Sequence, residues 1–297
     1  MKRHEQINHP FVGVIAKESY PHQEVFKPYP LVKSVVVALF PYSNQNKLAP
    51  KGTYLPAKMF YGRDYHLVVK DKLQEFVVKW ELPDAVIGVD TSPLDERLCA
   101  YLAGLGTFGD HNLLINPTLG TFFAIGTIMT SAVFHEYQQP IAELCTHCGA
   151  CLKACPTQAL TGGFHKERCL SNLSQKASSD FSLYDLMHHT CYGCDLCQDA
   201  CFYNSHPDYS LPELAWDGLS VLTWEGFLQL DAKQYFDYYR DKSWSWIAYE
   251  RMLRNLMVLR HHDQALSEQE VIQLATKTTK PWFLKHLQYL RGQHGKS

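Results

Sequence analysis

The chain has 297 residues, of which 46% are hydrophobic and 20% charged, and its formal net charge is −2. This is enough apolar material for a sizeable core, so the composition excludes gross disorder and favours one large or two to three small domains. The sequence has neither an apolar stretch of about 18 residues that could span a membrane nor the apolar core of a signal peptide. We therefore expect a soluble cytoplasmic protein with no membrane partner.

The first region, residues 1–138, alternates strand and helix patterns. An apolar stripe at helical spacing runs from Val69 to Trp80, and Pro93 suits the first turn of a helix that continues from Leu94 to Ala103. Short apolar, largely β-branched runs of strand length are bounded by turn residues at 11–15, 35–39, 85–89 and 121–125. The pattern predicts an α+β unit in which helices cover a mixed β-sheet.

Asp90 directly follows the third strand run and precedes the helix pattern. A carboxylate at a strand end is a common functional position in helix-covered sheets, but an Asp before a helix is also a common N-terminal cap, and the residues alone favour the cap. Gly104 to Gly109 matches G-x-G-x-x-G. A helix precedes it where a nucleotide-binding fingerprint requires a strand, so we interpret it as a tight loop.

The second region, residues 139–206, holds nine of the ten cysteines, between Cys145 and Cys201, and only Cys99 lies outside it. A disulfide-stapled secreted protein would be smaller and would spread its cysteines along the chain. The concentration instead indicates metal binding in a reducing compartment. Cys99 fits an ordinary core position on the helix after Asp90.

Two cysteine runs share one spacing. The run from Cys145 to Pro156 reads C-x2-C-x2-C-x3-C-P, and the run from Cys191 to Cys201 repeats it without the proline. In this ferredoxin spacing three thiolates hold one 4Fe–4S cluster and the fourth serves the other, whereas structural zinc sites usually show two C-x2-C pairs. Two clusters need eight thiolates and nine are present, so spacing alone leaves open whether Cys169 or Cys191 is a ligand.

The third region, residues 207–297, lacks strand runs and is predicted to be helical. Ser267 and Glu270 fit a capping box. The expected helices are 224–239, 246–260, 267–277 and 282–291. From Lys277 onward the chain has basic residues and no Asp or Glu; they are Lys277, Lys280, Lys285, Arg291 and Lys296. This basic segment fits either a solvated helix face or a surface that contacts nucleic-acid phosphates.

Several segments, in the same order along the chain, resemble epoxyqueuosine reductases, the cobalamin- and iron–sulfur-dependent enzymes of queuosine biosynthesis in tRNA. The similarity covers about residues 60–204 and extends weakly to Arg254-Asn255. The matching segments are Gly62-Arg-Asp-Tyr-His66, Val89-Asp-Thr-Ser-Pro93 with Glu96-Arg97, Gly104-Leu-Gly106, Cys145 to Pro156, Arg168-Cys-Leu-Ser171 and Gly193-Cys-Asp-Leu-Cys-Gln198.

The resemblance implies two 4Fe–4S clusters and a bound cobalamin. One cluster would use Cys145, Cys148, Cys151 and Cys201. The other would use Cys155, Cys169, Cys194 and Cys197. Cys191 would then be a spare thiol. The positions expected to contact the corrin are Tyr65, His66, Arg97, Gly109, Asn112, Ser171 and Asp195.

The resemblance also implies that the protein reduces epoxyqueuosine to queuosine in tRNA. Electrons would come from an external donor such as a flavodoxin or ferredoxin, and Asp90 would be the proton donor, which near neutral pH requires burial to raise its pKa. We expect a monomer with three parts: a cobalamin-binding catalytic domain over 1–138, a ferredoxin-like domain over 139–206, and a truncated HEAT-like helical domain over 207–297.

The sequence departs from the family in several places. It is short at both ends, has Asp110-His111 where relatives commonly show Lys-Asn, and has Phe202-Tyr203 in place of Pro-Trp. These departures leave two alternatives open. One is a related corrinoid reductase that acts on a small molecule, in the manner of reductive dehalogenases; the other is an iron–sulfur electron carrier. The Asp90 segment argues against a carrier, and the basic segment favours tRNA over a small molecule.

Overall fold

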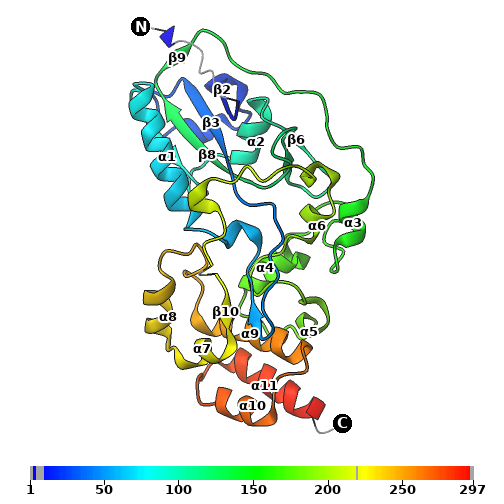
Figure 1. The fold of residues 1–297 in the computed structure, drawn as a ribbon. Coiled ribbons are helices and arrows are strands. Elements are labelled where there is room, and N and C mark those ends of the chain that lie inside the picture. Colours follow the sequence, from blue (N-terminus) through cyan, green and yellow to red (C-terminus); the bar gives the residue numbers. More distant parts are fainter. Residues whose placement is uncertain (1–2, 5–9, 219, 295–297) are drawn as a thin grey trace.

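The computed structural model describes residues 3–4, 10–218 and 220–294. Figure 1 shows a helix-covered sheet at one end of the molecule, a group of helices at the other, and short helices with long connections between them. Across these described ranges no helix is both long and apolar enough to cross a membrane.

The main sheet has four strands in the order β2-β3-β8-β5, and every neighbouring pair in it is antiparallel. Its strands are β2 (Val12–Ala16), β3 (Ser34–Pro41), β5 (Val86–Gly88) and β8 (Phe123–Thr130). The four predicted strands are therefore confirmed, but the prediction that the sheet is mixed was wrong. Strand patterns indicate which residues form strands, while the direction of each strand depends on connections that the pattern does not encode. The one parallel pair among the described strands, β1 (Arg3–His4) with β9 (Val133–Phe134), forms a separate sheet.

Helices cover both faces of this sheet. Helix α1 (Tyr65–Lys79) packs with alternate β3 residues such as Val36 and Phe40, and α2 (Glu96–Leu102) packs with the intervening ones, such as Val35 and Leu39. Every residue of β3 is buried, which explains why this central strand reads as a continuous apolar run without polar alternation.

Helix α2 begins later than predicted. Its first residue is Glu96 rather than Leu94, and Asp95 is its N-cap, since the Asp95 carboxylate accepts hydrogen bonds from the backbone N–H groups of Arg97 and Leu98. Pro93 lies before the cap. Asp90 is therefore free of the capping role that the sequence favoured for it.

The cysteine-rich segment lies between the two ends of the molecule. After β9 an extended stretch runs down one side to α3, as Figure 1 shows in green. The short helices of this segment are α3 (Ala150–Ala154), α4 (Leu170–Gln175), α5 (Leu183–Leu186) and α6 (Leu196–Asp199). A hairpin of β6 (Thr107–Phe108) and β7 (Leu114–Ile115) approaches it from the sheet, carrying the loop that contains Gly109.

The C-terminal region is mostly helical, as predicted, with two corrections. The expected helix 224–239 is broken into two, because Asp231 caps a new helix through a capping box with Gln234. The region also contributes a short strand, β10 (Leu222–Thr223), which pairs with β4 (Thr53–Tyr54). The helices are α7 (Trp224–Gln229), α8 (Ala232–Tyr239), α9 (Tyr249–His262), α10 (Glu268–Leu274) and α11 (Pro281–His294).

One apolar core joins the C-terminal helices to part of the cysteine-rich segment. Leu183, Tyr184 and Tyr192 are buried in the same cluster as Leu253 and Leu256 of α9. The Ser267–Glu270 capping box is present as predicted. The domain boundaries at 138 and 206 stay predictions, since the packing of this region crosses the second of them.

Candidate functional site

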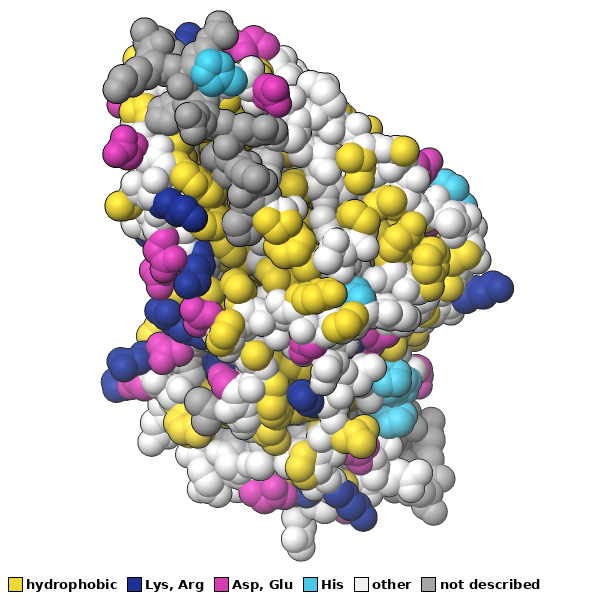
Figure 2. All heavy atoms as spheres, turned by 45° about the horizontal axis from the view of Figure 1, so that its top comes forward, with side chains coloured by type: hydrophobic (Ala, Val, Ile, Leu, Met, Phe, Trp, Pro, Cys, Tyr) yellow, Lys and Arg dark blue, Asp and Glu magenta, His cyan; other side chains and the backbone are white. Residues whose placement is uncertain are grey.

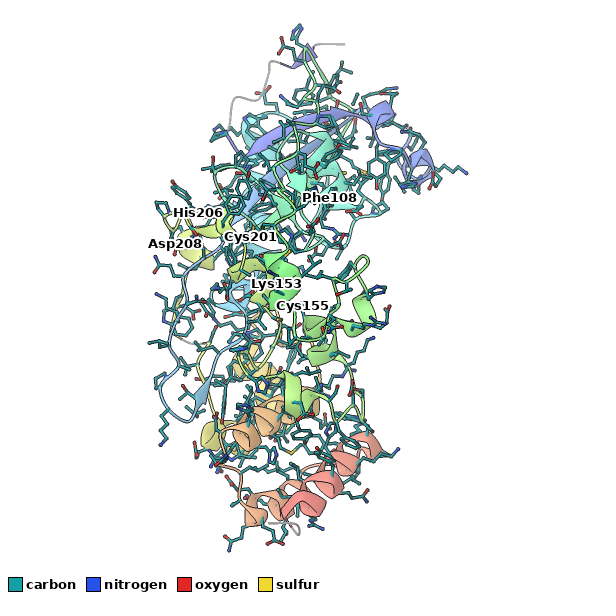
Figure 3. All side chains as sticks on the ribbon, turned by 90° about the vertical axis from the view of Figure 1, so that its right-hand side faces the viewer. Phe108, Lys153, Cys155, Cys201, His206 and Asp208 are labelled. Carbon is teal, nitrogen blue, oxygen red and sulfur yellow. The ribbon has the colours of Figure 1, made fainter. Side chains whose placement is uncertain are left out.

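Eight of the cysteines line two separate hollows. The smaller hollow is lined by the four that the resemblance assigned to one cluster, Cys145, Cys148, Cys151 and Cys201. The larger is an open cleft with a volume of about 570 Å³, and its lining includes the other four, Cys155, Cys169, Cys194 and Cys197. Figure 3 shows Cys155 and Cys201 at mid-height, between the sheet and the C-terminal helices. Four thiols around one small space are the donor set of a 4Fe–4S cluster, so both hollows fit that cofactor.

The thiols of the second set are close enough to affect each other. Burial, followed by the neighbouring Cys194 and Cys169, raises the pKa of Cys197 far above its usual range. Burial also raises the pKa of Cys194 to about 12, with smaller contributions from Cys169 and Cys155. A bound metal ion would offset this raised pKa, because it stabilises the thiolate form of its ligands.

Cys191 lies away from both hollows. Its side chain is completely buried in the C-terminal apolar core, beside Tyr192 and the helix α9 residues, and it lines neither hollow. Cys169, in contrast, sits at the edge of the larger cleft just before α4. The geometry thus places Cys169 rather than Cys191 with the second set.

Hydrogen bonds from buried polar side chains hold the loops that carry the second set of cysteines. The Asn255 amide on α9 donates to the backbone carbonyls of Ser174 (2.9 Å) and Cys191 (2.8 Å), and the Ser174 hydroxyl accepts from the backbone N–H of Gly193 (3.1 Å). Gly193 itself has a φ of +75°, and a Cβ there would meet a ring carbon of Phe60 at 2.7 Å. The segment that precedes Cys194 is therefore held in one conformation by α9 and by its glycine.

The cleft that holds the second set also contains Asp90. This residue has a φ of +55°, its side chain is 53% exposed, and its backbone N–H donates to Oε1 of the buried Glu96 at 2.8 Å. The hydroxyl of Tyr65 donates to Oδ2 of Asp90, and Nε2 of His66 lies 3.4 Å from the same oxygen. Both partners stand in the first turn of α1, where the N-cap Asp64 accepts from the backbone N–H of His66.

The carboxylate of Asp90 is held in its ionised form. The hydrogen bond from His66 lowers the pKa of Asp90, and this outweighs the opposite effect of burial. The condition for Asp90 to be a general acid near neutral pH, a pKa raised by burial, is therefore not met by Asp90 alone. Hydrogen bonds to Asp64 and Asp90 raise the pKa of His66 to about 9, so the proton of this group resides on the imidazole near neutral pH.

Five of the seven positions expected to contact a corrin line the cleft: Tyr65, Arg97, Asn112, Ser171 and Asp195. His66 touches the cleft residue Asp90, and Gly109 lies beneath the ring of His111, which lines the cleft. Nη1 of Arg97 donates to the backbone carbonyl of Asn112 at 2.9 Å. The walls also include apolar residues such as Met59, Phe123 and Leu160, and the volume is in the range of small-molecule and cofactor pockets. The cleft therefore fits an organic cofactor with a large apolar face.

Sequence reasoning missed two polar residues of these walls. Glu96 is 9% exposed, and burial, followed by the charge of Asp90, raises its pKa to about 8. His111 is 4% exposed and lines both hollows. Glu96 stood in a matching segment and His111 in a departure from the family, but neither their burial nor their partners could be read from the sequence.

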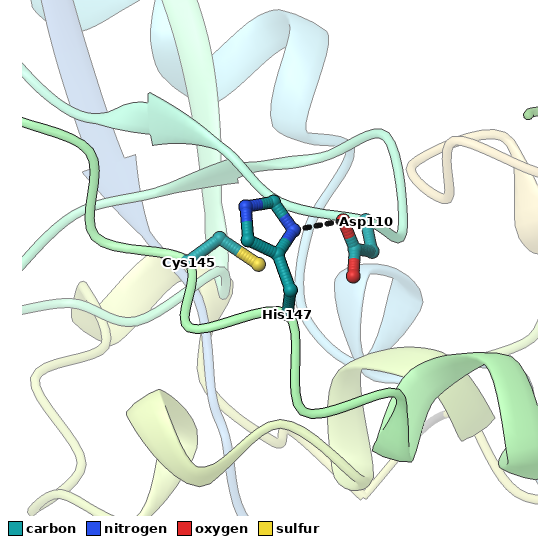
Figure 4. Close-up of side chains that lie close together, drawn as sticks. All are labelled: Asp110, Cys145 and His147. Atoms are coloured by element: carbon teal, nitrogen blue, oxygen red, sulfur yellow. Dashed lines mark hydrogen bonds and ion pairs between the residues drawn. The ribbon is translucent and has the colours of Figure 1, made fainter.

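Asp110 lies against the first set of cysteines. Its carboxylate is 2.8 Å from Nδ1 of His147, which stands between Cys145 and Cys148 in the sequence (Figure 4). Nε2 of His147 is 3.2 Å from Glu143. The ligand atoms of Asp110, Cys145 and His147 lie within 4.8 Å of one another. Asp110 is thus an acid that binds the first cysteine loop.

Two families match parts of the chain. One, described as a 4Fe-4S double cluster binding domain, matches residues 144–204, and the other, described as Epoxyqueuosine reductase QueG, DUF1730, matches residues 24–91. An epoxyqueuosine reductase of Listeria monocytogenes is 31% identical over 268 residues, which are 83% of this chain and 67% of that protein. One of Cyclobacterium marinum is 32% identical, over 66% of this chain and 74% of that protein.

Solved structures agree with these matches. An epoxyqueuosine reductase bound to an epoxyqueuosine-modified tRNA-Tyr stem loop has a TM-score of 0.82 and 25% identity, covering 94% of this chain and 84% of that one. The Streptococcus thermophilus enzyme also gives 0.82, at 22% identity, over 92% of this chain and 83% of that one. Fold and site together define an oxidoreductase with a double-cluster iron–sulfur domain. The chain belongs to the epoxyqueuosine reductase family.

Proposed function

We propose that this protein reduces epoxyqueuosine to queuosine in tRNA. The observation that carries the proposal is one cleft whose walls include both Asp90 and the second set of four cysteines. The relatives are named for this activity, and a structure of similar fold is bound to an epoxyqueuosine-modified stem loop. Converting an epoxide to an alkene consumes two electrons and two protons and releases water, so the site must supply both.

In this proposal the two hollows hold 4Fe–4S clusters. Cys145, Cys148, Cys151 and Cys201 would bind one, and Cys155, Cys169, Cys194 and Cys197 the other. The first hollow includes the exposed Cys148, which gives an external flavodoxin or ferredoxin a point of access. The second set opens into the Asp90 cleft, so electrons would pass from the surface inward to the reaction.

We place cobalamin in the cleft. It would supply the electron transfer to the epoxide carbon, which no side chain can perform. Arg97 and Asn112 form one polar edge of the space, and Ser171 lines the same cleft as Cys169. Asp195 contributes structure rather than an open acceptor, because its carboxylate accepts from the backbone N–H of Lys58 at 2.7 Å.

Asp90 and His66 would deliver one of the two protons, and the second would reach Asp90 from solvent through the partly exposed imidazole of His66. Tyr65 and Glu96 fix the Asp90 carboxylate and backbone, and the imidazolium of His66 holds the proton next to it. When substrate displaces water from the cleft, the ionised carboxylate loses solvation and takes up this proton, which it passes to the leaving oxygen. Asp90 is thus the donor and His66 its reservoir.

The test is anaerobic purification after iron and cobalamin supply, followed by a metal count and an assay on an epoxyqueuosine-modified tRNA stem loop, with nucleosides analysed by mass spectrometry. We expect about eight irons and about one cobalt per chain and the appearance of queuosine. Bound zinc, or iron without cobalt, contradicts the cofactor assignment. If the protein converted only the free epoxyqueuosine nucleoside and not the stem loop, this would favour a small-molecule reductase. If it held both clusters but converted neither substrate, this would favour an electron carrier. Localisation in the cytoplasm and a monomeric state belong to this proposal.

A further inference from the structure

His111 is a buried imidazole with one nitrogen that has no partner. The ring is 4% exposed, and its Nε2 makes no hydrogen bond to any described residue. Its Nδ1 accepts from the backbone N–H of Leu113 at 3.1 Å. A nitrogen that accepts carries no proton, so Nδ1 is unprotonated and the single N–H of the neutral ring is at Nε2.

The ring has one edge against its own loop. A Cβ at Gly109 would lie 2.6 Å from Cε1 and 3.1 Å from Nδ1 of His111, so the Nδ1–Cε1 edge faces the loop backbone, and position 109 must be a glycine for the ring to lie there. The Nε2–Cδ2 edge therefore points away from the loop. Because the ring lines both hollows, this N–H lies in the wall between them.

The loop bridges the two hollows: on one side of His111, Asp110 contacts the first cysteine set, and on the other side Asn112 lines the cleft. The neighbouring Asp110 lines only the first of the two hollows, and its carboxylate bonds to His147, between Cys145 and Cys148 (Figure 4). A buried N–H in this wall requires an acceptor, and the first hollow would bring cluster sulfur atoms to it.

We propose that Nε2–H of His111 donates a hydrogen bond to a sulfur atom of the first cluster and raises its reduction potential. The bond stabilises the reduced cluster more than the oxidised one, since the reduced cluster carries more negative charge on its sulfurs. This inference rests on the two-cluster part of the proposed function.

The test compares His111→Asn with His111→Gln. The Asn oxygen replaces Nδ1 as acceptor for Leu113 but places no donor at the Nε2 position, whereas the Gln amide nitrogen reaches that position. Both are titrated electrochemically after anaerobic cluster reconstitution without cobalamin, with reduction followed by electron paramagnetic resonance. His189→Asn, an exposed histidine outside both hollows, is the matched control.

In His111→Asn we expect one of the two clusters to show about a tenfold lower ratio of reduced to oxidised form at a fixed potential, which corresponds to about 59 mV for a one-electron couple. The other cluster, His111→Gln and the control should stay at the wild-type value. Unchanged potentials in His111→Asn at a full iron count overturn the inference and leave the proposed function intact. An incomplete iron count in the wild-type protein would instead contradict the two-cluster part of the proposed function.

A second measurement does not depend on a variant. Wild-type protein labelled with ¹⁵N-histidine should show a weak nitrogen coupling to the reduced first cluster in pulsed paramagnetic resonance, and His147→Gln should retain it. No coupling in the wild type, or a coupling lost with His147, overturns the assignment to His111.

Discussion

Nε2 of His66 lies 3.4 Å from Oδ2 of Asp90, and this ion pair sets the protonation of the cleft. The histidine is 35% exposed on its side chain, and its Nδ1 is held by Asp64 at 2.8 Å, so the ring is oriented toward Asp90 from the first turn of α1. In the proposed function the two residues act as one acid, because the proton sits on nitrogen in the resting state while the oxygen faces the cleft.

Asp90→Asn tests the oxygen of this pair. We expect turnover to fall about 10²- to 10⁴-fold, the usual loss for a general acid, with iron and cobalt contents unchanged. Asp84→Asn is the matched control, because Asp84 also has a positive φ (50°) and an exposed carboxylate but lies outside the cleft. Asn tolerates the left-handed conformation at both positions. An active Asp90→Asn enzyme would remove Asp90 from the proposed role.

His66→Gln tests whether the imidazole of His66 holds the proton, through the pH dependence of stability and of turnover. The pKa of His66 is raised from 6.5 to about 9 in the folded protein, so its ion pairs stabilise the fold fully below pH 6.5, and this contribution is lost as pH rises through 9. The difference in melting temperature between wild type and His66→Gln should therefore be largest at pH 6 and shrink toward pH 10. The wild-type pH–rate profile should fall near pH 9 and lose this limb in the variant. A pH-independent difference in melting temperature would contradict the assigned ionisation.

Glu96 positions Asp90 by accepting a hydrogen bond from its backbone N–H. Two substitutions separate the effect of the Glu96 charge from that of this hydrogen bond. The pKa of Glu96 is raised from 4.5 to about 8, so the wild-type protein loses stability as pH rises from 4.5 through 8, when the buried carboxyl must ionise. Glu96→Gln keeps an acceptor for the N–H of Asp90 and removes this loss, so its melting temperature relative to wild type should increase between pH 5 and 9. Glu96→Ala leaves that N–H unpaired, at a cost of about 1–3 kcal/mol, and should lower kcat at every pH. Parallel stability curves for wild type and Glu96→Gln would show that the carboxyl does not titrate in this window.

Alanine substitutions of Cys169 and Cys191 form a matched pair that tests which of the two binds the second cluster. Cys169→Ala should lose the second cluster and retain about four irons, whereas Cys191→Ala should retain about eight, because Cys191 is buried in the apolar core away from both hollows. Removing the Cys191 sulfur from a fully buried site should still lower the melting temperature, since it leaves a small cavity. The reverse iron counts would assign the ligand to Cys191.

The sequence predicted those parts of the molecule that local patterns determine. Strand runs such as 35–39 and the Ser267–Glu270 capping box are confirmed because both depend on neighbouring residues. The break at Asp231 had a local signal, a D-x-x-Q capping box, that the apolar stripe across it concealed. Three features depend on residues far apart in the chain, so no short stretch of sequence could predict them. They are the direction of the strands, the burial of Glu96 and the lack of a hydrogen-bond partner for Nε2 of His111.

The charges of the surface bear on tRNA binding. Figure 2 shows basic and acidic side chains intermixed along one edge of the molecule and apolar side chains across the middle of the same face. The basic segment at the C-terminal end differs in having no acidic residue, and Lys280, Lys285 and Arg291 are exposed in and before α11. Lys296, which was included in the predicted basic surface, lies outside the described residues.

Neutralising this segment tests whether it contacts phosphates. Binding that releases counterions weakens as salt rises, with a slope of about 0.7–0.9 per phosphate contact on a double-logarithmic plot. The triple variant Lys280→Gln, Lys285→Gln, Arg291→Gln should therefore reduce the slope of this double-logarithmic plot for stem-loop binding by roughly two to three. The slope is measured by fluorescence anisotropy between 50 and 200 mM salt. Lys27→Gln, Lys51→Gln and Lys79→Gln together remove the same charge from exposed positions in the N-terminal region and form the control. An unchanged slope in the α11 variant would assign the segment to a solvated helix face, and an equal effect of both triple variants would indicate that only net charge matters.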